Sequence, residues 1–178
     1  MEGKKVLLDS SHCEDILNSC TNWERSQVYT NNGTKVTEIS SFRKGAQVSL
    51  SAKSGSPLYS FLYDLSKLNG ITLLSSEIEC MVCRYNEGEY IKYHNDKLGN
   101  ENRRYFISVQ LSSSDSYTGG DFIYYENSNP HLISRERGSG CLLSSTVYHE
   151  VKEVTSGTRY SLIYFIHKGK FEANKSAI

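Results

Sequence analysis

Short stretches of alternating apolar and polar residues fill the chain from Glu77 onward. They are rich in Val, Ile, Tyr and Phe, and turns of Gly, Asn, Ser or Pro separate them, which is typical of antiparallel β-structure. Strands at this spacing, without long helices between them, predict a sandwich or an open barrel. We expect strands at Trp23–Thr30, Gln47–Leu50, Glu77–Tyr85, Tyr90–His94, Tyr105–Ser112, Asp121–Glu126, Gly140–Ser145, Val147–Val151 and Arg159–His167.

Two helices are also predicted, both in the N-terminal half. Ser10-Ser11, followed by acidic residues, predicts a short capped helix over residues 10–17. Pro57 opens a second helix, Leu58–Leu68, whose apolar residues recur at helical spacing until Asn69-Gly70 ends it. We expect both helices to pack on one face of a sheet, in a mainly β fold with flanking helices.

Length and composition favour one domain of 178 residues. We expect a single domain over 1–178, in which residues 1–76 give helical and strand support to a core at about 77–167. Because Lys+Arg and Asp+Glu both number 20, no general nucleic-acid binding is expected. The sequence shows no apolar run of membrane-spanning length and no secretory leader. We therefore expect a soluble protein, cytoplasmic or otherwise intracellular, with no membrane partner; no oligomeric state is predicted.

Five cysteines are scattered along the chain, and Cys80 and Cys83 have the CxxC spacing of a redox or zinc pair. They lie inside a predicted strand, where residues three apart face opposite sides. A shared metal is therefore disfavoured, and we interpret the cysteines as structural thiols in a reducing compartment.

Candidate chemistry is concentrated at His94, Asp96 and His149. His94 and Asp96 lie two residues apart, so on extended backbone their side chains point to the same side. His149 follows an apolar strand and could supply a third ligand from the opposite sheet face. Two imidazoles and one carboxylate on one face of a metal are the ligand set of non-haem Fe(II) oxygenases. Zinc could use the same residues, but the helical HExxH motif of many zinc hydrolases is absent from the sequence.

Arg159 is the candidate anchor for a diacid co-substrate. It follows a predicted turn at Thr155–Thr158 that would fold it back toward His149. Strand alternation puts Ser161 on the same side as Arg159. The guanidinium could clamp a carboxylate bidentately, with the Ser161 hydroxyl assisting. The motifs together predict a dioxygenase dependent on Fe(II) and 2-oxoglutarate.

Several motifs resemble the prolyl-4-hydroxylase-type 2-oxoglutarate/Fe(II) oxygenases, across roughly Glu77 to His167. The segments that carry the resemblance are Arg84–Tyr90 leading to His94-Asn95-Asp96, Ser108–Ser112, Tyr117–Phe122, and His149–Val151 leading to Gly157–Leu162.

The resemblance implies a double-stranded β-helix (jelly-roll) core in which His94, Asp96 and His149 bind iron. It also implies that Arg159 anchors 2-oxoglutarate and that the Tyr85 hydroxyl contacts it. The Gly119-Gly120 match implies a structural turn. Implied cofactors are Fe(II), 2-oxoglutarate as co-substrate and O2, with ascorbate as an accessory reductant. Because Asp96 is present, the halogenase variant of this chemistry, which lacks that carboxylate, is disfavoured.

The substrate is left open by these motifs. Hydroxylation of an unactivated C–H bond, prolyl 4-hydroxylase-like and acting on a peptide or protein, is the leading interpretation. Collagen-type prolyl hydroxylases typically carry Lys where this chain has Arg159, so a free amino acid, another small molecule or a nucleobase stays an alternative. A third interpretation is a non-catalytic jelly-roll binding module. A long shallow groove would favour a peptide, and an enclosed pocket would favour a small molecule.

Overall fold

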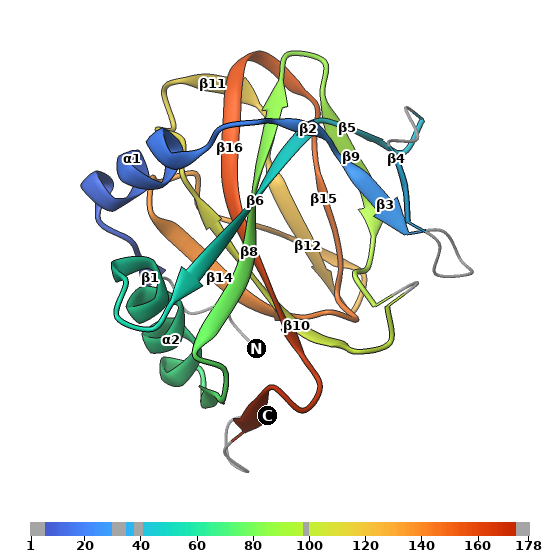
Figure 1. Cartoon of the computed structure of the whole chain (residues 1–178). Helices are drawn as coiled ribbons and strands as arrows, with labels where there is room; N and C mark the ends of the chain where they lie inside the picture. The colour runs from blue at the N-terminus through green and yellow to red at the C-terminus, as the bar shows by residue number, and fades with distance from the viewer. Residues whose placement is uncertain (1–5, 30–34, 38–40, 98–99, 174–178) are drawn as a thin grey trace.

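Two antiparallel sheets face each other in the computed structural model, which describes residues 6–29, 35–37, 41–97 and 100–173 (Figure 1). In spatial order the larger sheet contains β1 (Val6–Leu7), β14 (Ser139–Ser144), β10 (Arg103–Gln110), β16 (Val154–His167), β8 (Glu77–Asn86), β6 (Ala46–Lys53) and β2 (Glu24–Arg25), and β11 (Tyr117–Gly119) also pairs with β16. The smaller sheet contains β13 (Asn129–Leu132), β12 (Phe122–Glu126), β15 (Tyr148–Val151), β9 (Tyr90–His94) and β5 (Arg43–Lys44). The remaining pairs are β17 (Phe171–Ala173) with β7 (Ile71–Leu73), and β3 (Gln27–Tyr29) with β4 (Lys35–Thr37).

Helices α1 (Ser10–Ser19) and α2 (Pro57–Leu68) lie together beside the larger sheet (Figure 1). The α1 cap is Asp9, whose carboxylate accepts a hydrogen bond from the Ser11 backbone N–H at 2.7 Å. The sequence prediction started this capped helix at Ser10-Ser11 and did not single out Asp9. The cap of α2 is Ser56, which precedes Pro57 in the first turn. Proline fits there because its missing N–H would have no partner in that turn.

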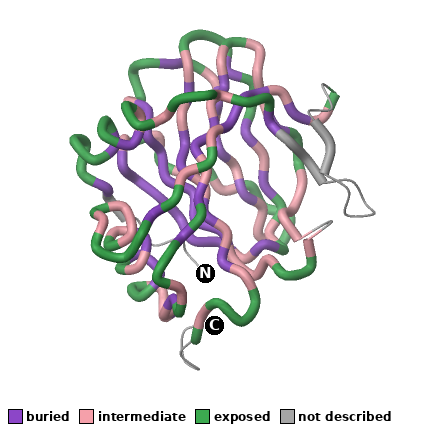
Figure 2. Tube along the Cα trace, viewed as in Figure 1, coloured by how far each residue is buried: buried purple, intermediate pink, exposed green. Residues whose placement is uncertain are grey.

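Strands β8, β10, β14 and β16 of the larger sheet carry buried residues on both of their faces (Figure 2). On β8, Ile78 and Val82 belong to a core shared with the helices, whereas Cys83 and Tyr85 belong to a second core between the two sheets. Period-2 alternation separates these two sets of side chains. This explains why Cys80 and Cys83 face different cores, and the described cysteines are free thiols. The prediction of structural thiols agrees with this placement.

A mainly β fold with flanking helices and a jelly-roll core is confirmed. The assignment of residues 1–76 as support and 77–167 as core stays a prediction. The structure adds that β5 and β6, both before residue 77, complete the two sheets. Among the described residues, no helix is long and apolar enough to cross a membrane.

Three local predictions are corrected by the structure. The expected turn at Thr155–Thr158 lies inside β16, which is continuous over Val154–His167. The segment between the predicted strands Asp121–Glu126 and Gly140–Ser145, where no strand was expected, contains β13, and His131 on β13 stacks on Tyr124 with ring centroids 4.9 Å apart. The predicted strand Trp23–Thr30 is split into β2 and β3, and Thr30 lies outside the described residues.

Gly119 and Gly120 let β11 pass close to β16. Both have positive φ, +69° and +63°, a backbone region that only glycine enters at little cost. A Cβ on Gly119 would lie 2.3 Å from the Glu153 carbonyl oxygen, and a Cβ on Gly120 would lie 3.2 Å from Cδ of Arg159. The two glycines therefore let β11 cross close to β16 beside Arg159. This agrees with the expectation that the Gly119-Gly120 turn has a structural role.

We predict that Gly119→Ala destabilises the fold more than Gly169→Ala does. Gly169 has a similar φ of +76° but nothing within 4 Å of a built Cβ. Its substitution should cost only backbone strain, about 1–2 kcal/mol, whereas overpacking at Gly119 adds about 1–3 kcal/mol. Thermal unfolding of the two variants measures the difference, and equal falls in Tm would contradict the close-approach argument.

Candidate active site

His94 and His149 are direct cross-strand neighbours in the smaller sheet. β9 pairs with β15, and His149 lies opposite His94 in the register. The expectation that His149 would come from the opposite sheet face is therefore wrong, because both imidazoles come from adjacent strands of one sheet. The register then shifts by one residue, so that Val151 lies opposite Ile91. This β-bulge lets Ile91 and His94, three residues apart, line the same cavity.

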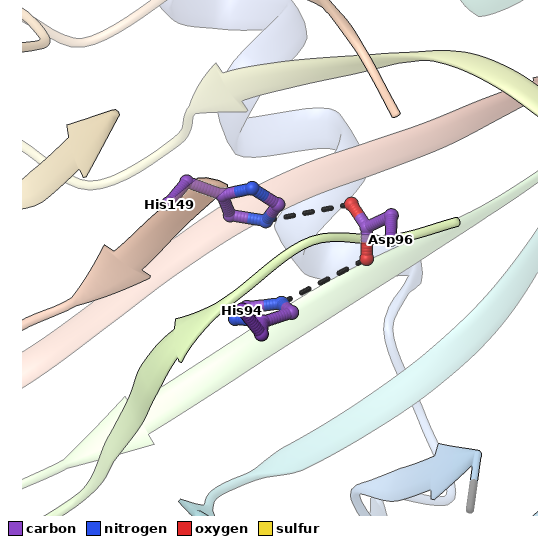
Figure 3. Close-up of side chains that lie close together, drawn as sticks. All are labelled: His94, Asp96 and His149. Atoms are coloured by element: carbon purple, nitrogen blue, oxygen red, sulfur yellow. Dashed lines mark ion pairs between the residues drawn. The ribbon is translucent and has the colours of Figure 1, made fainter. Parts of the chain in front are cut away.

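Asp96 lies just beyond the end of β9 and faces both imidazoles (Figure 3). Nε2 of His94 is 3.8 Å from Oδ1 of Asp96, and Nε2 of His149 is 3.4 Å from Oδ2. One donor atom from each of the three residues lies within 4.8 Å of the other two. The predicted triad is therefore brought together by the fold.

The other nitrogen of each imidazole faces the backbone. Nδ1 of His94 lies 2.7 Å from the Lys92 carbonyl oxygen, and Nδ1 of His149 lies 3.0 Å from the Val147 carbonyl oxygen. Since a carbonyl can only accept a hydrogen bond, each Nδ1 carries the proton and donates it. Each Nε2 is then left with its lone pair toward Asp96, which is the tautomer that a metal ligand needs.

This donor set fits a divalent ion of the first transition row. Donors bonded to one ion at about 2.1 Å lie about 3 Å apart when they are at right angles, close to the observed 3.4 and 3.8 Å. Burial, together with the neighbouring His149, lowers the pKa of His94 to about 4. His94 is therefore neutral near pH 7, as a metal ligand must be. Two nitrogens and one carboxylate suit non-haem iron.

Aromatic packing restrains the two imidazoles. Phe106 lies against His149 with ring centroids 4.6 Å apart, and Phe122 meets the same ring edge-on at 5.6 Å. Phe42 meets His94 edge-on at 5.6 Å. Such contacts limit the rotamers of the histidines, so the donor atoms are held in place before an ion arrives.

Arg159, Ser161 and Tyr85 line the same cavity of about 70 Å³ as the triad. Arg159 is buried, with 3% of its surface exposed, and its Nη1 donates to the Ser161 hydroxyl at 3.3 Å. Burial raises the pKa of Tyr85 to about 12, so its hydroxyl keeps its proton and can donate. A buried guanidinium beside two hydroxyls is suited to a carboxylate.

Two further guanidiniums lie at this site, and the sequence did not single them out. Arg43, from β5, donates to the Cys83 thiol at 3.5 Å and lines the same cavity as the triad. Arg103, from the start of β10, has its Nη1 3.9 Å from Oδ1 of Asp96 and its guanidinium 3.6 Å from the centre of the Phe165 ring. No sequence motif links either arginine to the triad, so only the fold shows that both lie at the site.

Comparison with known proteins identifies the family. Residues 80–167 match the model of the 2OG-Fe(II) oxygenase superfamily. The matched segment, which contains the triad and Arg159, is similar to this superfamily. A PKHD-type hydroxylase from Parvibaculum lavamentivorans is 35% identical over 91 residues, which cover 50% of this chain and 42% of that protein. The chain thus spans less than half the length of the curated relatives that it matches. The family implies Fe(II) and 2-oxoglutarate as cofactors.

Solved structures share the fold of this chain. A prolyl-4-hydroxylase from Pseudomonas putida superposes with a TM-score of 0.63 at 15% identity, covering 94% of this chain and 92% of that one. A prolyl hydroxylase from Trichoplax adhaerens, in complex with a hypoxia inducible factor oxygen degradation domain peptide fragment, gives 0.64 at 18% identity, covering 90% and 77%. At these identities the likeness concerns the jelly-roll fold alone.

We predict that His149→Ala removes metal binding and leaves the fold in place. The loss should exceed the roughly 10–100-fold that follows removal of a residue behind a metal ligand, because a donor atom itself disappears. Anaerobic calorimetric titration with Fe(II) measures the affinity, and circular dichroism checks the fold. His131→Ala is the matched control on β13, and Fe(II) affinity unchanged by His149→Ala would contradict the ligand assignment.

Proposed function

We propose that this chain is an Fe(II)- and 2-oxoglutarate-dependent dioxygenase that hydroxylates an unactivated C–H bond, in the manner of a prolyl 4-hydroxylase acting on a peptide or protein. The observation that carries the proposal is a shared cavity. Two imidazole Nε2 atoms and the Asp96 carboxylate converge in it, and the buried Arg159 lines the same space.

In this proposal His94, Asp96 and His149 would hold the ferrous ion. Arg159 and Ser161 bind the far carboxylate of 2-oxoglutarate, and the protonated Tyr85 hydroxyl donates to the same co-substrate. When bound, iron, 2-oxoglutarate and O2 supply the oxidising power for hydroxylation. The chain contributes binding and orientation, and the apolar side chains of Phe106 and Ile91 line the cavity beside the triad.

A groove beside the triad supports a peptide substrate. It has a volume of about 570 Å³, and His94 and Asp96 line it together with residues of β6, β8 and β16. It follows β6 from Gln47 to Ser51, which is four residue-to-residue steps or about 13 Å of extended chain. An open channel of this length suits a segment of polypeptide better than a single small molecule. The relative from Trichoplax adhaerens, which was solved with a peptide, supports the same choice.

The decisive experiment measures co-substrate turnover and substrate oxidation together. The chain, supplied with Fe(II), 2-oxoglutarate and O2, should form succinate, and a peptide library containing proline should gain the mass of one oxygen. Omission of ascorbate tests whether this reductant is needed. Oxygen transfer to free amino acids alone would favour the small-molecule alternative, and tight cofactor binding without turnover would favour a non-catalytic module.

We predict that Arg159→Ala raises the 2-oxoglutarate concentration needed for half-maximal succinate formation by about 10- to 100-fold. Loss of a charge-assisted contact costs about 1.5–3 kcal/mol, which corresponds to that range. Arg84→Ala is the matched control, because Arg84 lies next in register, opposite Tyr160, and stacks over Trp23. Normal co-substrate dependence in Arg159→Ala would refute the anchor assignment.

A further inference from the structure

Strand β6 has a free edge over most of its length. β2 pairs with β6 only at Ala46 and Gln47, near the start of β6 (Figure 1), although β6 continues to Lys53. On its other side β6 pairs with β8 along its whole length, without a register shift. Among the described residues, no third strand pairs with β6. The stretch from Val48 to Lys53, which we call the free edge, is therefore a border of the larger sheet.

Two hydrogen bonds show which backbone groups point toward the free edge. On the side of β2, the Gly45 carbonyl oxygen accepts a hydrogen bond from the Ser26 N–H at 3.1 Å. On the side of β8, the Ser54 N–H donates to the Ser76 carbonyl oxygen at 2.7 Å. Successive residues of a strand direct their N–H and C=O groups to opposite neighbours. The odd-numbered residues of β6 therefore direct these groups outward, and the even-numbered residues direct them to β8.

Ser49 and Ser51 are the odd-numbered residues in the middle of the free edge. Both are exposed. Within the described part of the chain, their outward N–H and C=O groups have no hydrogen-bond partner. Each residue thus offers one donor and one acceptor to a ligand that lies along the edge.

The free edge lacks the features that usually prevent pairing with another chain. Soluble proteins protect their edge strands with charged side chains, prolines or β-bulges. The sequence of β6 contains no proline, its register with β8 is regular, and its one charged residue is Lys53 at the end. A regular edge of this kind is a template for an added strand.

The free edge lies at the level of the triad. Ser49 and Ser51 line the groove of about 570 Å³ together with His94 and Asp96. Ser49 lies opposite Met81 in the register of β6 and β8, and Met81 also lines the smaller cavity that contains the triad. An extended segment paired with Ser49 would therefore run past the triad.

We propose that the free edge binds the substrate polypeptide as an added strand, and that backbone hydrogen bonds to Ser49 and Ser51 align the segment beside the triad. This inference rests on the proposed function and gives the mode of substrate binding. The occupant is a segment of the substrate because the same groove contains both the edge and the triad. Main-chain hydrogen bonds supply affinity in this mode of recognition, and pockets for alternate side chains supply specificity.

The position of the proline follows from its chemistry. Proline has no N–H to donate, so the proline to be hydroxylated occupies a position whose backbone points away from β6. Because the direction alternates, the residues directly before and after it point their backbone groups toward the free edge. Their N–H groups are then the donors to β6.

The test uses the full chain loaded with Mn(II) and 2-oxoglutarate, without O2. Fluorescent peptide pools carry a central proline among randomised residues, each pool has one backbone N-methyl group at a defined position, and fluorescence anisotropy gives the dissociation constants. N-methylation of the residue before or after the proline should weaken binding about tenfold, because it removes a donor to β6. N-methylation two residues away should change the affinity by less than about twofold, because that donor points away from β6.

A variant of the edge tests the same pairing from the side of the protein. Ser49→Pro removes the outward N–H of Ser49 and leaves the ladder with β8 intact, as edge strands allow. It should weaken binding of the pool without N-methyl groups about tenfold. Ser49→Ala, which keeps the backbone N–H, is the matched control and should bind as the original chain does. Thermal unfolding checks that both variants are folded.

Equal effects of N-methylation at all positions, no binding of any pool, or unchanged binding by folded Ser49→Pro would each overturn the inference. A dimer of the chain that Ser49→Pro dissociates, with no effect on peptide binding, would assign the edge to a second copy and would also overturn it. Binding of Mn(II) and 2-oxoglutarate is titrated in the same samples. If both bind and the alternation is missing, only this inference fails. If neither binds, the proposed function fails, and the inference fails with it.

Discussion

The pairing of β9 with β15 is the constraint on which the rest of the site depends. Backbone hydrogen bonds hold His94 opposite His149, so the two imidazoles meet through sheet register and not through a flexible loop. A slip of one residue would turn one imidazole to the outer face, because strand side chains alternate. On that outer face Tyr93 stacks on Tyr148 with ring centroids 4.6 Å apart. This contact couples the residues that precede the two histidines and secures the register.

Strand alternation connects stability and chemistry in the larger sheet. The outward residues of β8 and β16, such as Val82 and Leu162, pack in the core under the helices. The inward residues, Tyr85 and Arg159, are register partners and reach the cavity. The same two strands therefore anchor the fold and present the side chains that are proposed to bind the co-substrate. A rigid strand can place a side chain more accurately than a loop can, which suits a site that must orient three reactants.

Much of the site could be predicted from the sequence because its residues lie in long, strongly patterned strands. β9 was predicted with its correct bounds, and β8 to within one residue. Short strands such as β5 and β13 carry no periodic signal, so Arg43 was missed. The Ser156-Gly157 pair indicated a turn in the sequence, but in the structure this glycine has a different role. Gly157, with φ +77°, lies within β16 where the Ser116 carbonyl oxygen approaches to 2.3 Å from a built Cβ; the glycine serves a close crossing of strands, not a reversal.

The concentration of guanidiniums around the triad is better explained by binding than by stability. Arg159 and Arg43 are 3% and 9% exposed and line one cavity, and burying like charges together is costly for folding. A fold selected for stability alone would place apolar side chains at these inward positions, as it does at Phe106. The free-energy cost of burying these like charges is offset when a bound ligand supplies the opposite charge. The cavity is thus suited to an anion, and the proposed metal triad lies where it could act on a ligand that such an anion holds in place.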